Sequence, residues 1–97
     1  PFEPENQEEL VRLLKEIKEN YPKKNIWCYT GYTYERLLQN AAQRELLNWI
    51  DVLVDGPYIE AERDPDLLFL GSLNQRLVDV QASLRSGMVI LYQGNGF

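Results

Sequence analysis

The chain has 97 residues, of which 44% are apolar and 11% aromatic, so we expect residues 1–97 to form a single domain with a modest core. Its net charge of -5 repels a phosphate backbone and argues against nucleic acid or an anionic membrane as a partner. One cysteine, Cys28, and no histidine exclude an intrachain disulfide, a zinc site and an iron–sulfur cluster built from this chain alone, and they favour a reducing, cytoplasmic setting.

The first predicted element is an amphipathic helix. Asn6 and Glu9 have the spacing of a capping box, and Pro22 ends the pattern. Between them, apolar residues recur at helical spacing: Leu10, Leu13, Leu14, Ile17 and Tyr21. Because the opposite face is charged, we expect this helix to lie on a sheet with its charged side in water.

Two short strands with helices between them come next. The pattern predicts a strand over 26–30, a helix over 34–38 capped by Thr33, a helix over 43–50, and a strand over 51–55 ended by Gly56 and Pro57. Three apolar residues flanked by acids suit a strand that is buried on both faces. This alternation favours parallel β/α units over a meander.

The last third of the chain is less regular. Residues 63–66 predict a turn, 67–70 are apolar but too few to classify, and 71–74 predict a loop. A strand is expected over 76–80. Residues 82–85 fit either one helical turn closed by Gly87 or the first arm of a hairpin whose second arm is 88–92, and we favour the helical turn.

Small polar residues follow both of the predicted parallel strands. Thr30 and Gly31 end the first strand, and Asp55 and Gly56 end the second. In parallel β/α folds, the loops after the carboxyl ends of the strands collect ligand-binding groups. The alternative is that Thr30 and Asp55 only form hydrogen bonds within their own loops, because threonine, aspartate and glycine are ordinary turn residues.

Three further candidates have plain structural alternatives. Trp27 and Tyr29 fit packing better than ligand stacking, and Cys28 fits a small buried group better than a nucleophile. A polar cluster follows the predicted loop: Asn74, Gln75 and Arg76. These side chains could read a planar ligand or the backbone of a partner, or they could form a satisfied loop network, and the sequence leaves both open.

Four stretches together resemble a known family: "PFEPEN", "NIWCYTGYTYERLL", "IDVLVDGPYIEAERDPDLLFLGSLNQRLVDV" and "SLRSGMVILY". They resemble the later part of the activating proteins of anaerobic ribonucleoside-triphosphate reductase, which belong to the radical S-adenosylmethionine superfamily. The resemblance covers roughly residues 1–92. Its most specific pieces are Trp27-x-Tyr29-Thr30-Gly31-Tyr32, residues 51–56, and Gly71-Ser72-x-Asn74-Gln75-Arg76, in the order and spacing of the family.

The resemblance implies an α/β fold, namely a fragment of a partial parallel β/α barrel. It implies an activase that uses a 4Fe-4S cluster and S-adenosylmethionine to generate a glycyl radical on the reductase, its protein partner. The family's three-cysteine motif and its Gly-Gly-Asp segment have no counterpart in this chain. The chain alone is therefore expected to be the C-terminal part of an activase, to be inactive and to bind neither cofactor stably.

The resemblance also places two residues of this chain near the cofactor. Thr30 and Asp55 match residues at the ends of two family strands that line the S-adenosylmethionine pocket, whereas no residue here matches a catalytic or metal-ligating one. The rival hypothesis is a non-catalytic α/β interaction module that keeps the later strands of the barrel. Because a truncated barrel leaves an exposed strand edge, we also expect the isolated chain to self-associate.

Overall fold

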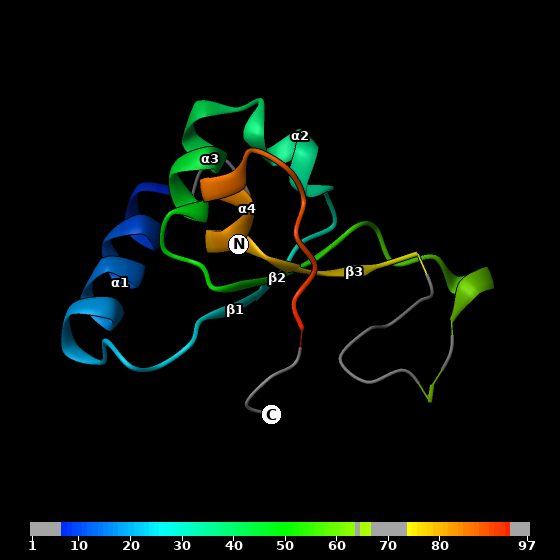
Figure 1. Cartoon of the computed structure of the whole chain (residues 1–97), viewed down its shortest axis with the longest axis horizontal. Helices are drawn as coiled ribbons and strands as arrows, with labels where there is room; N and C mark the ends of the chain where they lie inside the picture. The colour runs from blue at the N-terminus through cyan, green and yellow to red at the C-terminus, as the bar shows by residue number, and fades with distance from the viewer. Residues whose placement is uncertain (1–6, 64, 67–73, 94–97) are drawn as a thin grey trace.

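The computed structural model describes residues 7–63, 65–66 and 74–93, and it folds as a small sheet with its helices gathered on one side (Figure 1). The elements are α1 (Gln7–Asn20), β1 (Trp27–Tyr29), α2 (Tyr34–Leu38), α3 (Ala41–Leu47), β2 (Val52–Asp55), the 3-10 helix η2 (Glu60–Glu62), β3 (Arg76–Asp79) and α4 (Val80–Ser86). The expected α/β class is confirmed.

The three strands form a mixed sheet in the order β1-β2-β3. β1 and β2 are parallel, with Trp27 opposite Val52, as the alternation of elements predicts. β3 is antiparallel to β2, with Asp55 opposite Arg76, so the expectation of a purely parallel sheet is wrong for this strand. A parallel return needs a crossover connection, usually a helix, and the described residues between β2 and β3 contain only the short η2.

The predicted helices form close to their expected positions. α1 forms where a helix was predicted but packs mainly against α3, and two members of the predicted apolar face, Leu13 and Tyr21, are exposed. Its predicted cap Asn6 lies outside the described residues. The Thr33 side chain caps α2 by accepting a hydrogen bond from the Arg36 amide at 3.2 Å. α3 begins two residues before the predicted start because the Asn40 side chain accepts from the Gln43 amide at 3.0 Å.

The C-terminal part contains the helical turn that we favoured. The Asp79 side chain caps α4, which ends β3 one residue earlier than predicted, and Gly87 closes the helix with a left-handed φ of 77°. The segment that follows runs back along β3, where the Asp79 amide donates to the Ile90 carbonyl and the Tyr92 amide donates to the Leu77 carbonyl. Figure 1 shows this segment crossing β3.

The core lies between the helices and one face of the sheet. Its buried members are Leu14, Tyr34, Leu37, Leu46, Leu47, Ile50, Leu53, Val78 and Val80. Alternate strand residues such as Leu53 and Val78 face the helices, and full burial of each such side chain contributes about 1.5–3 kcal/mol. Trp27 instead packs edge-on against Tyr92, with ring centroids 5.4 Å apart.

Two sequence-based expectations are not tested by the described residues. The apolar run 67–70 lies outside them, and so does most of the loop predicted over 71–74, while the turn predicted over 63–66 is described except for residue 64. Within the described ranges, no helix is both long enough and apolar enough to cross a membrane.

Candidate functional site

The loops that follow β1 and β2 lie side by side and form what we call the corner, residues 30–34 and 55–57. The Thr30 amide donates to the Val54 carbonyl at 3.0 Å, and the Gly56 amide donates to the Tyr32 carbonyl at 2.8 Å. These bonds follow from the parallel pairing of β1 with β2, which brings their carboxyl ends to one edge of the sheet. The structure thus brings the two sequence-predicted residues, Thr30 and Asp55, onto adjoining loops.

Thr30 is buried and organises the start of its loop. Its side-chain oxygen accepts a hydrogen bond from the Tyr32 amide at 3.1 Å, and 8% of the residue is exposed. This is a common turn arrangement for threonine. Within the part of the chain that the structure describes, this hydroxyl accepts one hydrogen bond and donates none, so it can still donate to a ligand.

Asp55 is a buried carboxylate, only 1% exposed, with three donors around it. Its Oδ2 accepts from the amide of Tyr34, the first residue of α2, at 2.8 Å. The Arg76 guanidinium donates from Nε to Oδ1 at 3.0 Å and from Nη2 to Oδ2. This two-point pairing is the geometry that arginine forms with carboxylates, and it compensates the cost of burying the charge.

The same guanidinium also reaches an acid on α2. Arg76 Nη2 donates to Glu35 Oε1 at 2.6 Å, so one cation bridges two carboxylates. The hydrogen bond to Asp55 is the main reason why the pKa of Arg76 is raised above its ordinary value. The hydrogen bond from Arg76 is likewise the main reason why the pKa of Glu35 is lowered. Both shifts favour the charged forms of Arg76 and Glu35.

The two residues before Arg76 hold the rest of the β2 turn. The Asn74 side-chain amide donates to the Pro57 carbonyl at 2.6 Å, and the Gln75 side-chain amide donates to the Gly56 carbonyl at 3.2 Å. Three consecutive residues, 74–76, therefore hold three consecutive residues, 55–57. The sequence left open whether residues 74–76 bind a ligand or form a loop network. In the structure their side chains form hydrogen bonds of a loop network. Tyr34 and Glu35 belong to it as well, and no local sequence signal marked them.

Cys28 lies in β1, and its environment does not suit a ligand of an iron–sulfur cluster. Its side chain packs against the core cluster, and burial raises the pKa of its thiol, which disfavours the thiolate that binds metals. The described residues contain no group of three or more histidine, cysteine or acidic side chains able to hold a metal. A 4Fe-4S cluster does not fit a chain with this single cysteine.

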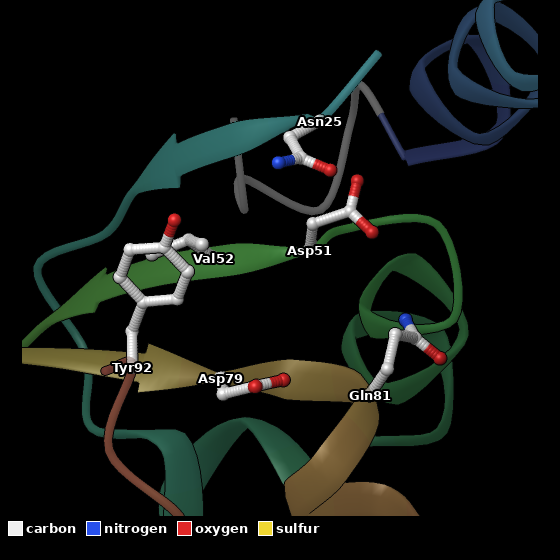
Figure 2. A pocket seen from close by; sticks show the side chains of 6 residues that line it. All are labelled: Asn25, Asp51, Val52, Asp79, Gln81 and Tyr92. Carbon is white, nitrogen blue, oxygen red and sulfur yellow. The ribbon is translucent and has the colours of Figure 1, made fainter. Parts of the chain in front are cut away.

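A hollow lies at the opposite end of the sheet, where β1 and β2 begin (Figure 2). It has a volume of about 200 Å³ and is lined by Asn25, Asp51, Val52, Asp79, Gln81 and Tyr92. Its polar groups already serve the fold: Asp51 accepts from Lys18 and the Ile26 amide, and Gln81 donates to the Ile50 carbonyl. The corner at the carboxyl ends of the strands is therefore the stronger candidate site.

Comparison with known proteins identifies the family. Residues 1–78 match the family model described as "4Fe-4S single cluster domain". The chain belongs to this family. It is also 40% identical over 75 residues to the anaerobic ribonucleoside-triphosphate reductase-activating proteins of Pasteurella multocida and Escherichia coli K12. Each match covers 77% of this chain. The matches cover 48% of the Pasteurella protein and 47% of the Escherichia protein.

A protein of the same name from Enterobacteria phage T4 is 40% identical over 77 residues, which cover 79% of this chain and 46% of that protein. The resemblance to reductase-activating proteins is thereby confirmed. The chain spans about half the length of the curated relatives it matches. No solved structure matches the chain significantly.

Proposed function

We propose that this chain is the C-terminal part of a glycyl-radical activase, an oxidoreductase of the radical S-adenosylmethionine superfamily that acts on anaerobic ribonucleoside-triphosphate reductase. The observation that carries the proposal is the 40% identity, over 77% of the chain, to proteins named as activators of that reductase. The match to a 4Fe-4S family supports the same proposal, because a radical S-adenosylmethionine activase needs such a cluster.

The chemistry divides between this chain and the rest of the intact protein. In the intact protein, a cluster and S-adenosylmethionine supply the radical that oxidises a glycine of the reductase. We assign no residue of this chain to the cluster, because its only cysteine is Cys28, which is partly buried against the core. The chain alone is expected to be inactive. What its own residues contribute is a shaped, water-excluding wall for S-adenosylmethionine.

We assign that wall to the corner, with Thr30 and Asp55 as its cofactor-binding residues. The Thr30 hydroxyl has a proton to donate to a polar atom of the cofactor, and it sits on a loop whose backbone is held by β2. Asp55 lies at the end of β2, where its carboxylate fixes the first turn of α2 beside the site. We place the protein in the cytoplasm, with the reductase as its partner and neither nucleic acid nor membrane.

The test is radical formation by the intact protein that contains this chain. The protein is purified without oxygen, its iron and sulfide are reconstituted, and it is mixed with S-adenosylmethionine, a reductant and the reductase. We expect 5'-deoxyadenosine to form together with a glycyl-radical signal in the electron paramagnetic resonance spectrum. If reductase binds but neither product appears in cluster-loaded protein, the proposal is wrong and the non-catalytic interaction module becomes the better reading.

The self-association of the isolated chain is a separate prediction. β1 is the terminal strand in the described sheet order, and a terminal strand is where another chain can add to a sheet. Light scattering of the 97-residue chain at increasing concentration would reveal this association. A constant monomer mass at high concentration would contradict it.

A further inference from the structure

We propose that Arg76 is a positioning residue for the cofactor site, assisted by Asn74 and Gln75. Together these three side chains form what we call the clamp, residues 74–76, which sets the shape of the corner without touching the cofactor. The inference rests on the proposed function, because it presumes that the corner borders S-adenosylmethionine. It assigns a role to the polar cluster that the sequence left open.

The Asp55 side chain joins the end of β2 to the start of α2. Backbone bonds join the loops at Thr30 and Gly56, but the start of α2 is held through a side chain, since the Tyr34 amide donates to Asp55 Oδ2. A rotation of the Asp55 carboxylate would therefore move the first turn of α2 against β2. The orientation of this carboxylate therefore helps to set how the start of α2 lies against β2.

Arg76 fixes the orientation of the Asp55 carboxylate. Its Nε and Nη2 donate to different oxygens of Asp55, so the planar guanidinium determines the plane of the carboxylate. A lysine ammonium would keep the charge but lacks the planar two-point geometry of arginine, so the carboxylate could rotate. Charge compensation and orientation are thus separable at this position, which makes the proposal testable.

Arg76 is already engaged by protein carboxylates and is not placed to bind the cofactor itself. Its guanidinium is engaged by Asp55 and by Glu35, two carboxylates that hold a single cation between them. The charge of the cation is shared between these two carboxylates, which weakens its attraction for a third anion such as the carboxylate of S-adenosylmethionine. The guanidinium therefore acts on the site through Asp55.

The clamp extends along the turn. Gln75 and Asn74 take up the carbonyl oxygens of Gly56 and Pro57 and so direct both groups toward residues 74–76. Gly56 has a left-handed φ of 90°, and a Cβ there would approach the Asn74 side chain to 3.6 Å. The positive φ and the hydrogen bonds to two consecutive carbonyls restrict the conformations available to this turn.

The experiment uses the intact, cluster-loaded protein and compares Arg76→Lys with wild type. Arg76→Lys keeps the charge beside Asp55, so we expect the protein to fold while the dissociation constant and KM for S-adenosylmethionine rise roughly 10- to 100-fold, with kcat nearly unchanged. In the cluster-free protein, hydrogen exchange at the Tyr34 amide is expected to become at least about tenfold faster. This second readout does not require activity.

Glu35→Gln is the matched control, because Glu35 contacts the same guanidinium from the exposed side. We expect the affinity for S-adenosylmethionine to stay within about twofold of wild type in this variant. Gln75→Met provides a variant that leaves the buried charge pair intact while removing the bond to the Gly56 carbonyl, and it should raise KM in the same direction as Arg76→Lys.

Failure of this inference can be told apart from failure of the proposed function. If wild-type protein neither binds S-adenosylmethionine nor forms the radical, the proposed function is wrong. If wild type does both and Arg76→Lys binds the cofactor equally well, the positioning role is wrong. A fall in kcat at unchanged KM would also overturn it, since that result would place Arg76 in the chemical step. Should Arg76→Lys fail to fold, an unchanged KM in Gln75→Met overturns the clamp on its own.

Discussion

One aspartate lies just before β2 and another is its last residue, and the two are held in different ways. At the start, Asp51 accepts from the Lys18 ammonium and from the Ile26 amide, and about a quarter of each charged side chain is exposed. At the end, Asp55 accepts from the forked Arg76 guanidinium and from the Tyr34 amide, and only 1% of its side chain is exposed. Each carboxylate secures the backbone of a neighbouring element.

The different exposure of the two aspartates indicates where substitutions should be tolerated. A partly hydrated ion pair loses little when one member is removed, because water can replace it. A buried carboxylate has no such substitute, so its partner is required both for stability and for geometry. The end of the sheet where ligands bind in β/α folds is the end that carries the buried carboxylate, whose arginine partner is about a third exposed.

The largest expected effect comes from removing the partner of each aspartate. Arg76→Ala leaves Asp55 buried and unpaired and should lower the free energy of unfolding by about 3 kcal/mol. Lys18→Ala should cost about 1 kcal/mol or less, because Asp51 stays partly hydrated and keeps the Ile26 amide. Urea denaturation of the intact protein measures both values. Equal losses would show that the two ends are not different.

A second, smaller effect is expected in the backbone of the corner. Gly56→Ala forces a left-handed φ of 90° on a residue with a Cβ and should cost about 1–2 kcal/mol. Gly31→Ala is the matched control in the other loop, where no atom of the described residues beyond its chain neighbours lies within 4 Å of the position that a Cβ would occupy, and it should be nearly neutral. Thermal unfolding of both variants compares them, and a neutral Gly56→Ala would argue against a strained turn.

The smallest expected effect concerns Glu35 and its dependence on pH. Because the hydrogen bond from Arg76 lowers the pKa of Glu35, the stability from this pair is present above the ordinary glutamate pKa of 4.5 and is lost as the pH falls through the lowered value. Since Glu35 is largely exposed, Glu35→Gln should cost about 0.5 kcal/mol or less at neutral pH.

The measurement for this pair is the difference in unfolding free energy between wild type and Glu35→Gln as a function of pH. The difference should be constant above about pH 5 and should shrink toward zero below the ordinary glutamate pKa. Glu16→Gln, on the exposed side of α1, controls for the loss of one negative charge. A difference that grows as the pH falls would have the wrong sign for this account.

Local patterns predicted much of the fold because they depend on neighbouring residues. The apolar spacing of α1, the Thr33 cap of α2 and the apolar run of β2 were all visible in sequence. The antiparallel direction of β3 was not, because it depends on the path of the residues between β2 and β3. Sequence rules also placed Thr30 and Asp55 at strand ends. They could not reveal the ion cluster around Asp55, since Arg76 is 21 residues from Asp55 and 41 from Glu35.

The most direct test of the central claim is the affinity of the intact, cluster-loaded protein for S-adenosylmethionine, measured by titration. The account predicts that substituting both corner residues, Thr30→Val with Asp55→Asn, weakens binding at least about tenfold, whereas Thr30→Ser keeps the hydroxyl and binds as wild type does. Asp51→Asn, at the other end of β2, should also leave binding unchanged. Unchanged affinity in the double variant, or an equal loss in Asp51→Asn, would contradict a cofactor site at the corner.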